Sequence, residues 1–158
     1  MFSSIGFIGT GTMGTAVARA AVNGAQGAPV LLANRTRSKA EAVARELGVQ
    51  TADNETVARE CGLIFLGVKP QMMEQLLSGL APILKARTDR FVLASMAAGL
   101  DARRIQEMAG GAYPVICLAT LIVVLVGQSK PLMIAGAFII GWAGAGGLLQ
   151  LATSVCNM

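Results

Sequence analysis

The chain has 158 residues, which is enough for one domain with a hydrophobic core and too few for two full-sized domains. Its 13 basic and 9 acidic residues give a net charge of +4 and are interspersed, so no nucleic-acid surface is predicted. The chain has no histidine, and Cys61, Cys117 and Cys156 stand far apart, which excludes common zinc-binding spacings, a disulfide framework and histidine-assisted nucleophilic catalysis.

We therefore expect no metal site, and we expect the three cysteines to be inert packing residues in a reducing cytoplasm. The first apolar stretch begins at Phe2 without a basic segment before it, so no signal peptide is predicted.

The first half of the chain alternates strand and helix patterns. Residues 5–8 predict a buried strand, 13–23 a helix closed by Gly24, 30–33 a second strand, and 38–47 a helix closed by Gly48. Within that second helix Glu41 and Arg45 stand four residues apart with the acid first, which predicts a surface ion pair.

The alternation continues to residue 116. A short helix is expected after Asn54 as its N-cap, followed by a strand over 63–68, a helix over 71–80, a strand over 91–95, a helix capped by Asp101 and a further strand starting in 113–116. This order predicts βαβ units, so the fold class expected for residues 1–116 is α/β, a Rossmann-like doubly wound parallel sheet.

Residues 117–158 do not continue this alternation. Beyond Glu107 the one charged residue is Lys130, and residues 132–156 form an uncharged stretch that would measure about 37 Å as a helix, against about 30 Å for a bilayer core. We expect this apolar C-terminal segment to be helical. Three interpretations stay open: a membrane hairpin, a chimeric or frameshifted segment, and a segment packed as core, including against another chain.

A glycine-rich turn follows the first predicted strand and opens the first predicted helix. In its GxGxxG pattern, glycine at 9 permits a tight turn, glycine at 11 lets the backbone approach a pyrophosphate, and glycine at 14 lets helix and strand pack closely. The helix that starts here turns free N–H groups and a positive dipole end toward the phosphates. The turn therefore predicts dinucleotide binding, with a purely structural turn as the alternative; its residues are Gly9, Thr10, Gly11, Thr12, Met13 and Gly14.

The end of the second predicted strand indicates which dinucleotide binds. A site for NAD would carry Asp or Glu there, whereas this chain has Asn34, Arg35 and Thr36, followed by Arg37. Arg35 can bind a 2′-phosphate and Thr36 can donate a hydrogen bond to it, which favours NADP(H). The alternative is that both arginines are solvated loop charges.

Two further turns complete a set that occurs in one order along the chain. They are Phe65-Leu66-Gly67-Val68-Lys69-Pro70-Gln71 and Ser95-Met96-Ala97-Ala98-Gly99. Together with IGFIGTGTMG and Asn-Arg-Thr, they make residues 1–116 resemble the N-terminal NADP-binding domain of pyrroline-5-carboxylate reductase, the last enzyme of proline synthesis.

The resemblance implies that five residues line the nicotinamide side of the cofactor: Val68, Lys69, Pro70, Ala97 and Ala98. It also implies that Asn54 lies near the adenosine. Pro70 would give a rigid turn, and the small residues at 97–99 would leave room for a ring. The alternatives are a solvent-facing lysine at 69 and a plain tight turn at 97–99.

The resemblance further implies hydride transfer from NADPH to the imine of the small-molecule substrate 1-pyrroline-5-carboxylate, giving proline, with no metal and in a family of homo-oligomers. The substrate-binding and dimerisation domain of that family is not recognisable in residues 117–158, so we expect a truncated member and assign no catalytic residue. One alternative is a non-catalytic NADPH-binding remnant, with or without attachment to a membrane through the C-terminal segment. The other is a β-hydroxyacid dehydrogenase-like or F420-dependent NADP reductase-like domain.

Overall fold

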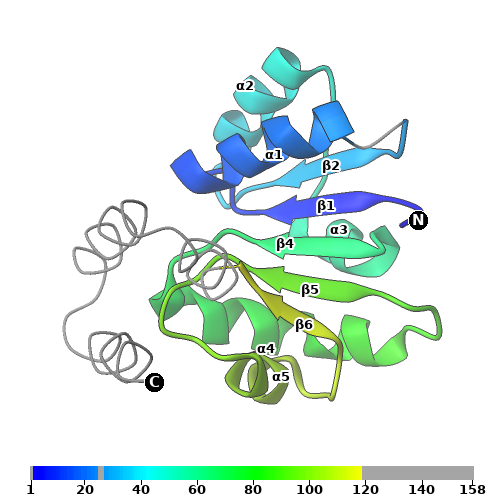
Figure 1. Cartoon of the computed structure of the whole chain (residues 1–158), viewed down its shortest axis with the longest axis vertical. Coiled ribbons are helices and arrows are strands. Elements are labelled where there is room, and N and C mark those ends of the chain that lie inside the picture. The colour runs from blue at the N-terminus through cyan, green and yellow to red at the C-terminus, as the bar shows by residue number, and fades with distance from the viewer. Residues whose placement is uncertain (1, 25–26, 119–158) are drawn as a thin grey trace, which may run out of the picture.

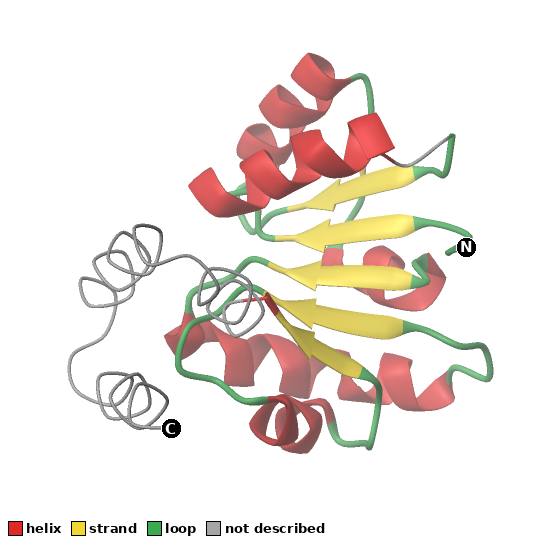
Figure 2. Ribbon diagram, in the orientation of Figure 1, coloured by secondary structure: helices red, strands yellow, loops and turns green. Residues whose placement is uncertain are grey.

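Among the residues that the structure describes, six short strands form one parallel sheet. The arrowheads that can be seen in Figure 2 lie at the same edge. The computed structural model describes residues 2–24 and 27–118. Neighbouring strands are parallel throughout, and their order is β3-β2-β1-β4-β5-β6, which confirms the predicted Rossmann-like fold. The strands are β1 (Ile5–Ile8), β2 (Val30–Ala33), β3 (Gln50–Thr51), β4 (Leu63–Leu66), β5 (Val92–Ser95) and β6 (Val115–Cys117).

The direction in which the chain crosses the sheet reverses between β1 and β4. From β1 the chain moves outward through β2 and β3, then returns to β4 on the other side of β1 (Figure 1). The strand ends form one row, because Ile8 pairs with Ala33 and Leu66, and Ser95 pairs with Leu66 and Cys117. The segments that leave these strands therefore start side by side at a switch point, where open α/β sheets bind their ligands.

Five helices lie between the strands: α1 (Thr12–Gly24), α2 (Arg37–Leu47), α3 (Asn54–Glu60), α4 (Pro70–Ala86) and α5 (Ala102–Ala109). Helix α2 ends as predicted at Gly48, whose φ of 68° is the left-handed conformation that glycine adopts without a Cβ penalty. Helix α5 begins as predicted after Asp101, whose carboxylate accepts a hydrogen bond from Arg104 N at 2.7 Å.

Helices cover both faces of the sheet, as a parallel sheet requires (Figure 1). On one face, Phe7 and Leu32 pack with Ala18 of α1 and Ala44 of α2. On the other face, Ile64, Leu66 and Leu93 pack with apolar side chains of α3, α4 and α5. Both strand-derived sets are almost wholly buried, so two separate apolar layers hold the sheet.

The face that carries α1 and α2 is less covered toward β6. Phe7, Phe65, Ala94 and Ile116 form one row across this face, and Phe7 stacks on Phe65 with ring centroids 4.6 Å apart. Phe7 is fully buried, whereas Ile116 is 45% exposed, because no described helix lies over β6 on this side in Figure 1.

Two predicted side-chain interactions, the N-cap of α3 and the ion pair of Glu41, involve a different residue in the structure. The N-cap of α3 is Asp53 and not Asn54, because the carboxylate one residue earlier accepts a hydrogen bond from Thr56 N at 2.6 Å. The carboxylate of Glu41 pairs with Arg37 at 2.9 Å, while Arg45 donates instead to the backbone oxygen of Glu41. Both arginines stand four residues from Glu41, and sequence spacing alone could not choose between them.

Helix α4 is longer than predicted and continues through Pro82 to Ala86. A proline inside a helix removes one backbone hydrogen bond and crowds the preceding turn, so Pro82 is unfavourable in the helix interior. The buried face of α4 continues past the proline through Met73, Leu77, Leu80 and Leu84, so packing outweighs the lost bond.

Of residues 117–158, only Cys117 and Leu118 belong to the described part, and Cys117 is the last residue of β6. The predictions of a membrane hairpin, a chimeric segment or a packed segment otherwise lie outside the described residues. Among the helices that are described, none combines the length and apolarity needed to cross a bilayer.

Candidate dinucleotide-binding site

The glycine turn, residues Gly9–Gly14, is held in its shape by contacts that leave no room for a side chain. Gly9 has a φ of 101°, and a Cβ there would meet the backbone of Gly67 at 2.7 Å. A Cβ on Gly14 would lie 2.1 Å from the Gly9 oxygen, so the first turn of α1 rests directly on the end of β1. These contacts agree with the roles predicted for glycine at 9 and 14.

Gly11 is different, because a Cβ built on it meets nothing within 4 Å. Gly11, Thr12 and Met13 are all exposed, and no acidic residue lies in the first turn of α1. The turn therefore presents open backbone and the positive end of a helix dipole at the switch point, which fits a pyrophosphate.

Gly67 has a structural role that was not predicted from the sequence. It follows β4, and a Cβ there would lie 2.6 Å from the Gly9 oxygen and 2.8 Å from Met96 Cε. Gly67 thus lets the turn after β4 approach the glycine turn. The predicted strand over 63–68 contained Gly67, whereas β4 ends at Leu66. A glycine inside a strand pattern, which often marks the close approach of another backbone, was the available signal.

The arginine turn, residues 34–36, leaves β2 beside the glycine turn. Asn34 Nδ2 donates to Thr10 Oγ1 at 2.6 Å, and Asn34 Oδ1 accepts from Thr36 N at 3.2 Å. Thr36 is the N-cap of α2, yet its side chain makes no capping hydrogen bond within the described residues. Its hydroxyl can therefore donate to a phosphate oxygen.

The two arginines of this region have different surroundings. Arg37 is the first residue of α2 and is paired with Glu41. Arg35 is exposed and takes part in none of the ion pairs found among the described residues. Arg35 is consequently the better placed of the two for a 2′-phosphate.

The lysine–proline turn, residues 67–70, lies on the other side of the switch point. Pro70 occupies the first position of α4, where its missing N–H costs no helical hydrogen bond, and exposed Lys69 is the N-cap. Val68 is half-buried and packs against the core.

The alanine turn, residues 96–99, follows β5, the strand beside β4. Ala97 N donates to Ser95 Oγ at 3.2 Å, and Ser95 is fully buried. Ala97 is buried and Ala98 half-buried, while Gly99 adopts a φ of 80°. Residues 97–99 therefore carry no bulky side chain, while Met96 before them is buried with its Cε next to Gly67.

The structure brings four of the predicted segments together at one edge, since β1, β2, β4 and β5 end in one row. Asn54 begins α3 after β3, the outermost strand beyond β2, so it lies at the same edge but two strands from β1. The nearness of Asn54 to a bound adenosine stays a prediction.

The described cysteines offer no nucleophile to this site. Burial raises the pKa of the Cys61 thiol, and burial together with the charge of Asp101 raises the pKa of the Cys117 thiol. Both thiols stay protonated at neutral pH, the inert state that packing cysteines show. Over residues 2–24 and 27–118, no cluster of three or more His, Cys, Asp or Glu side chains could hold a metal ion.

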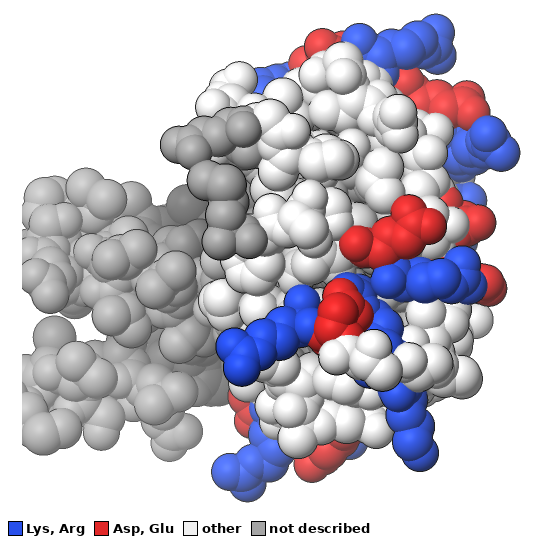
Figure 3. Space-filling model, turned by 90° about the vertical axis from the view of Figure 1, so that its right-hand side faces the viewer, with Lys and Arg blue, Asp and Glu red and all other residues white. Residues whose placement is uncertain are grey.

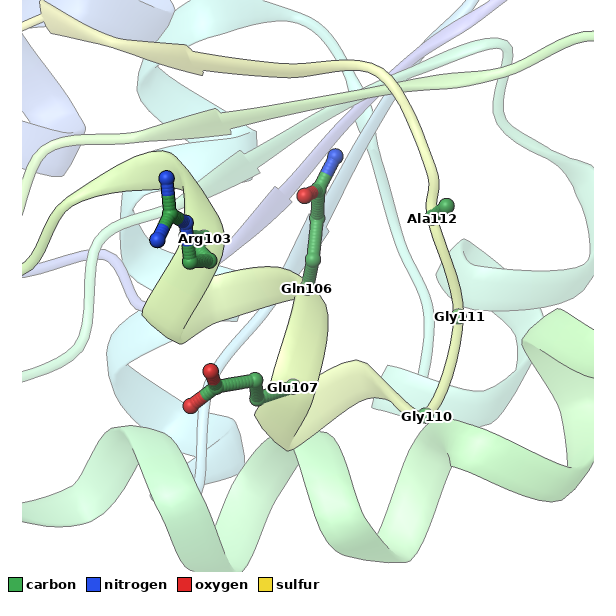
Figure 4. Close-up of a pocket in the computed structure, with 6 residues that line it drawn as sticks. All are labelled: Arg103, Gln106, Glu107, Gly110, Gly111 and Ala112. Atoms are coloured by element: carbon green, nitrogen blue, oxygen red, sulfur yellow. The ribbon is translucent and has the colours of Figure 1, made fainter.

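A shallow depression of about 270 Å³ lies elsewhere, between α5 and the segment that leads to β6 (Figure 4). Gln106 stands in this gap and donates to Tyr113 O at 2.6 Å. Tyr113 packs on Phe91 with ring centroids 5.0 Å apart, just before β5 and β6 begin, so the depression is not part of the candidate site.

The face seen in Figure 3 carries basic and acidic side chains interspersed with uncharged ones. No large area of one sign is visible on that face, in agreement with the sequence.

Comparison with known proteins places the chain among oxidoreductases. A family model described as NADP oxidoreductase coenzyme F420-dependent matches residues 4–99, more than half of the chain. The chain belongs to this family. The matched residues include all four turns and end at Gly99, so the match concerns the nucleotide-binding part and leaves the substrate to be decided by other means.

The relatives are pyrroline-5-carboxylate reductases, which confirms the resemblance seen in the sequence. The enzyme of Glycine max is 34% identical over 114 residues, 68% of this chain and 39% of that protein. The solved structure from Streptococcus pyogenes is 25% identical with a TM-score of 0.57, covering 71% of this chain and 40% of that one. A Plasmodium falciparum pyrroline carboxylate reductase solved with NADP bound shares the fold, with 24% identity, a TM-score of 0.54, and coverage of 71% and 40%. The chain thus spans about 40% of the length of these relatives.

Proposed function

We propose that this chain binds NADPH along the carboxyl edge of its sheet and serves the reduction of 1-pyrroline-5-carboxylate to proline. The observation that carries the proposal is the convergence of the glycine, arginine, lysine–proline and alanine turns on one switch point. Membership of an NADP oxidoreductase family and the NADP found in the Plasmodium falciparum reductase support the choice of cofactor.

Each turn then has a part in binding. The open backbone at Gly11 and the start of α1 bind the pyrophosphate, and Arg35 with the Thr36 hydroxyl binds the 2′-phosphate. Val68, Pro70, Ala97 and Ala98 orient the nicotinamide and keep water from one side of it.

When bound, NADPH supplies the hydride that reduces the imine carbon. Exposed Lys69 stands beside the proposed nicotinamide position, where its positive charge attracts a substrate that carries a carboxylate. In the same proposal the chain acts in the cytoplasm on this small-molecule substrate.

The test is an assay of the full chain with NADPH and 1-pyrroline-5-carboxylate, in which NADPH consumption and proline are measured together. We expect proline to form in step with NADPH oxidation. NADPH binding without proline would instead support a non-catalytic cofactor-binding protein. Turnover of a β-hydroxyacid with NADP⁺, but not of the imine, would favour the dehydrogenase-like alternative.

A further inference from the structure

Asn34 joins the glycine turn to the arginine turn through both ends of its carboxamide. Nδ2 donates to Thr10 Oγ1 at 2.6 Å, and Oδ1 accepts from Thr36 N at 3.2 Å. Thr10 is only 6% exposed and the first of these bonds is partly buried, so it is worth more than a surface contact. Each polar atom of the Asn34 side chain thus has one partner within the protein.

The Thr10 end of this link is itself anchored. Thr15 Oγ1, in the first turn of α1, donates to Thr10 O at 3.3 Å. Gly9 N donates to Ala33 O at 2.8 Å, which extends the β1–β2 pairing by one residue into the turn. The start of α1, the glycine turn and the arginine turn are thus one hydrogen-bonded unit, with the Asn34 side chain as its connection across the two turns.

We propose that Asn34 is a positioning residue that fixes the pyrophosphate-binding turn relative to the 2′-phosphate-binding turn, acting through Thr10 and Thr36. The inference rests on the proposed function, because it concerns the same NADPH site. The expectation that Asn34 itself contacts the nucleotide stays a separate prediction.

The physical reason lies in the cost of ordering a binding loop. A glycine turn that is held before the ligand arrives loses less conformational entropy on binding. NADPH and NADH share the pyrophosphate, so a loosened glycine turn should weaken both dinucleotides. A residue that touched only the 2′-phosphate would affect NADPH alone.

The experiment measures the dissociation constants of NADPH and NADH for the full chain and for three variants: Asn34→Ala, Thr10→Val and the double variant. Each single change removes one partner of the 2.6 Å bond. We expect each to weaken both dinucleotides by about 10-fold, and the double variant to bind about as well as either single variant. The conservative variant Thr10→Ser keeps the hydroxyl, so it should recover most of the affinity for both dinucleotides that Thr10→Val loses.

Asn34→Asp provides a second readout that a folding defect would not produce. The side chain keeps its shape, and the Thr10 hydroxyl can turn to donate to the new carboxylate, so the link between the turns is retained. The added negative charge stands beside the 2′-phosphate site. We expect NADH binding close to that of the wild type and NADPH binding at least about 10-fold weaker.

Additive effects in the double variant would overturn the inference, as would an Asn34→Ala variant that loses NADPH affinity only. Unchanged binding by both single variants, with a wild type that binds NADPH, would refute the positioning role and leave the proposed function standing. A folded wild type that binds neither dinucleotide would refute both.

Discussion

At the scale of single residues, glycines in this domain have opposite tolerances for a side chain. A Cβ on Gly14 would lie 2.1 Å from the Gly9 oxygen, and the contact is with backbone that cannot rotate away. A Cβ on Gly79, exposed in the middle of α4, meets nothing within 4 Å. The first glycine is required by packing, whereas the second only weakens its helix.

We predict that Gly14→Ala lowers the free energy of unfolding by about 1–3 kcal/mol, because α1 must move away from the glycine turn. NADPH affinity should fall with it. The matched change Gly79→Ala should raise stability by about 0.5–1 kcal/mol, since alanine is the better helix former. Urea unfolding measures both, and equal effects of the two substitutions would contradict the packing described here.

Substitutions of the two arginines after β2 should likewise have different effects on dinucleotide binding. Arg35→Ala should weaken NADPH binding by about 10- to 100-fold and leave NADH binding unchanged, because a charged hydrogen bond to phosphate is worth about 1.5–3 kcal/mol. Arg37→Ala should change neither, since Arg37 is paired with Glu41. Parallel titrations of both variants with both dinucleotides test this. A larger loss for Arg37→Ala would transfer the phosphate contact to that residue.

At the scale of elements, the ends of the helices depend on single capping groups. The Asp53 carboxylate accepts a hydrogen bond from Thr56 N at 2.6 Å, and this backbone bond is the main reason that the pKa of Asp53 lies below its ordinary value of 3.8. A carboxylate with a lowered folded pKa stabilises the fold above the unfolded pKa. That contribution is lost as the pH falls through the folded pKa.

Asp53→Asn keeps an oxygen acceptor and removes the titration. We predict that the wild type is more stable than this variant at neutral pH, and that the difference disappears as the pH is lowered below about 4, toward the folded pKa of Asp53. Urea unfolding at a series of pH values measures this difference directly. Two curves that stay parallel into the acid range would show that the carboxylate charge does not support α3.

Most elements could be predicted from the sequence because their signals are local. The strands of Val, Ile, Leu and Phe, the stop at Gly48 and the cap at Asp101 depend on neighbouring residues only. Strand β3 could not be predicted, because Gln50 and Thr51 carry no apolar pattern and pair only through the edge of β2. The extension of α4 past Pro82 likewise depends on packing against the sheet, which is a tertiary effect.

The same distinction between local signals and tertiary contacts applies to the candidate site. The turns that form it are short motifs and were all visible in the sequence. The contact of Gly67 with Gly9 and the hydrogen bond from Asn34 to Thr10 were not, because each joins residues that are brought together only when the strands pair.

At the scale of the whole molecule, the described helices cover one face of the sheet near β6 more fully than the other. Ile64 is 1% exposed under α3 and α4, whereas Ile116 is 45% exposed on the opposite face. We predict that Ile64→Ala costs about 2–5 kcal/mol of stability, and that Ile116→Ala costs less than about 1 kcal/mol. Urea unfolding of the full chain compares them. A cost for Ile116→Ala as large as that for Ile64→Ala would mean that this face is covered in solution.

The central claim is that the carboxyl edge of this sheet recognises a dinucleotide with a 2′-phosphate. The most direct measurement is a titration of the full chain with NADPH and with NADH, followed by nicotinamide fluorescence, with circular dichroism to confirm that the domain is folded. We predict binding of both dinucleotides, with NADPH at least about 10-fold tighter. A folded protein that binds neither, or that binds NADH more tightly than NADPH, would contradict it.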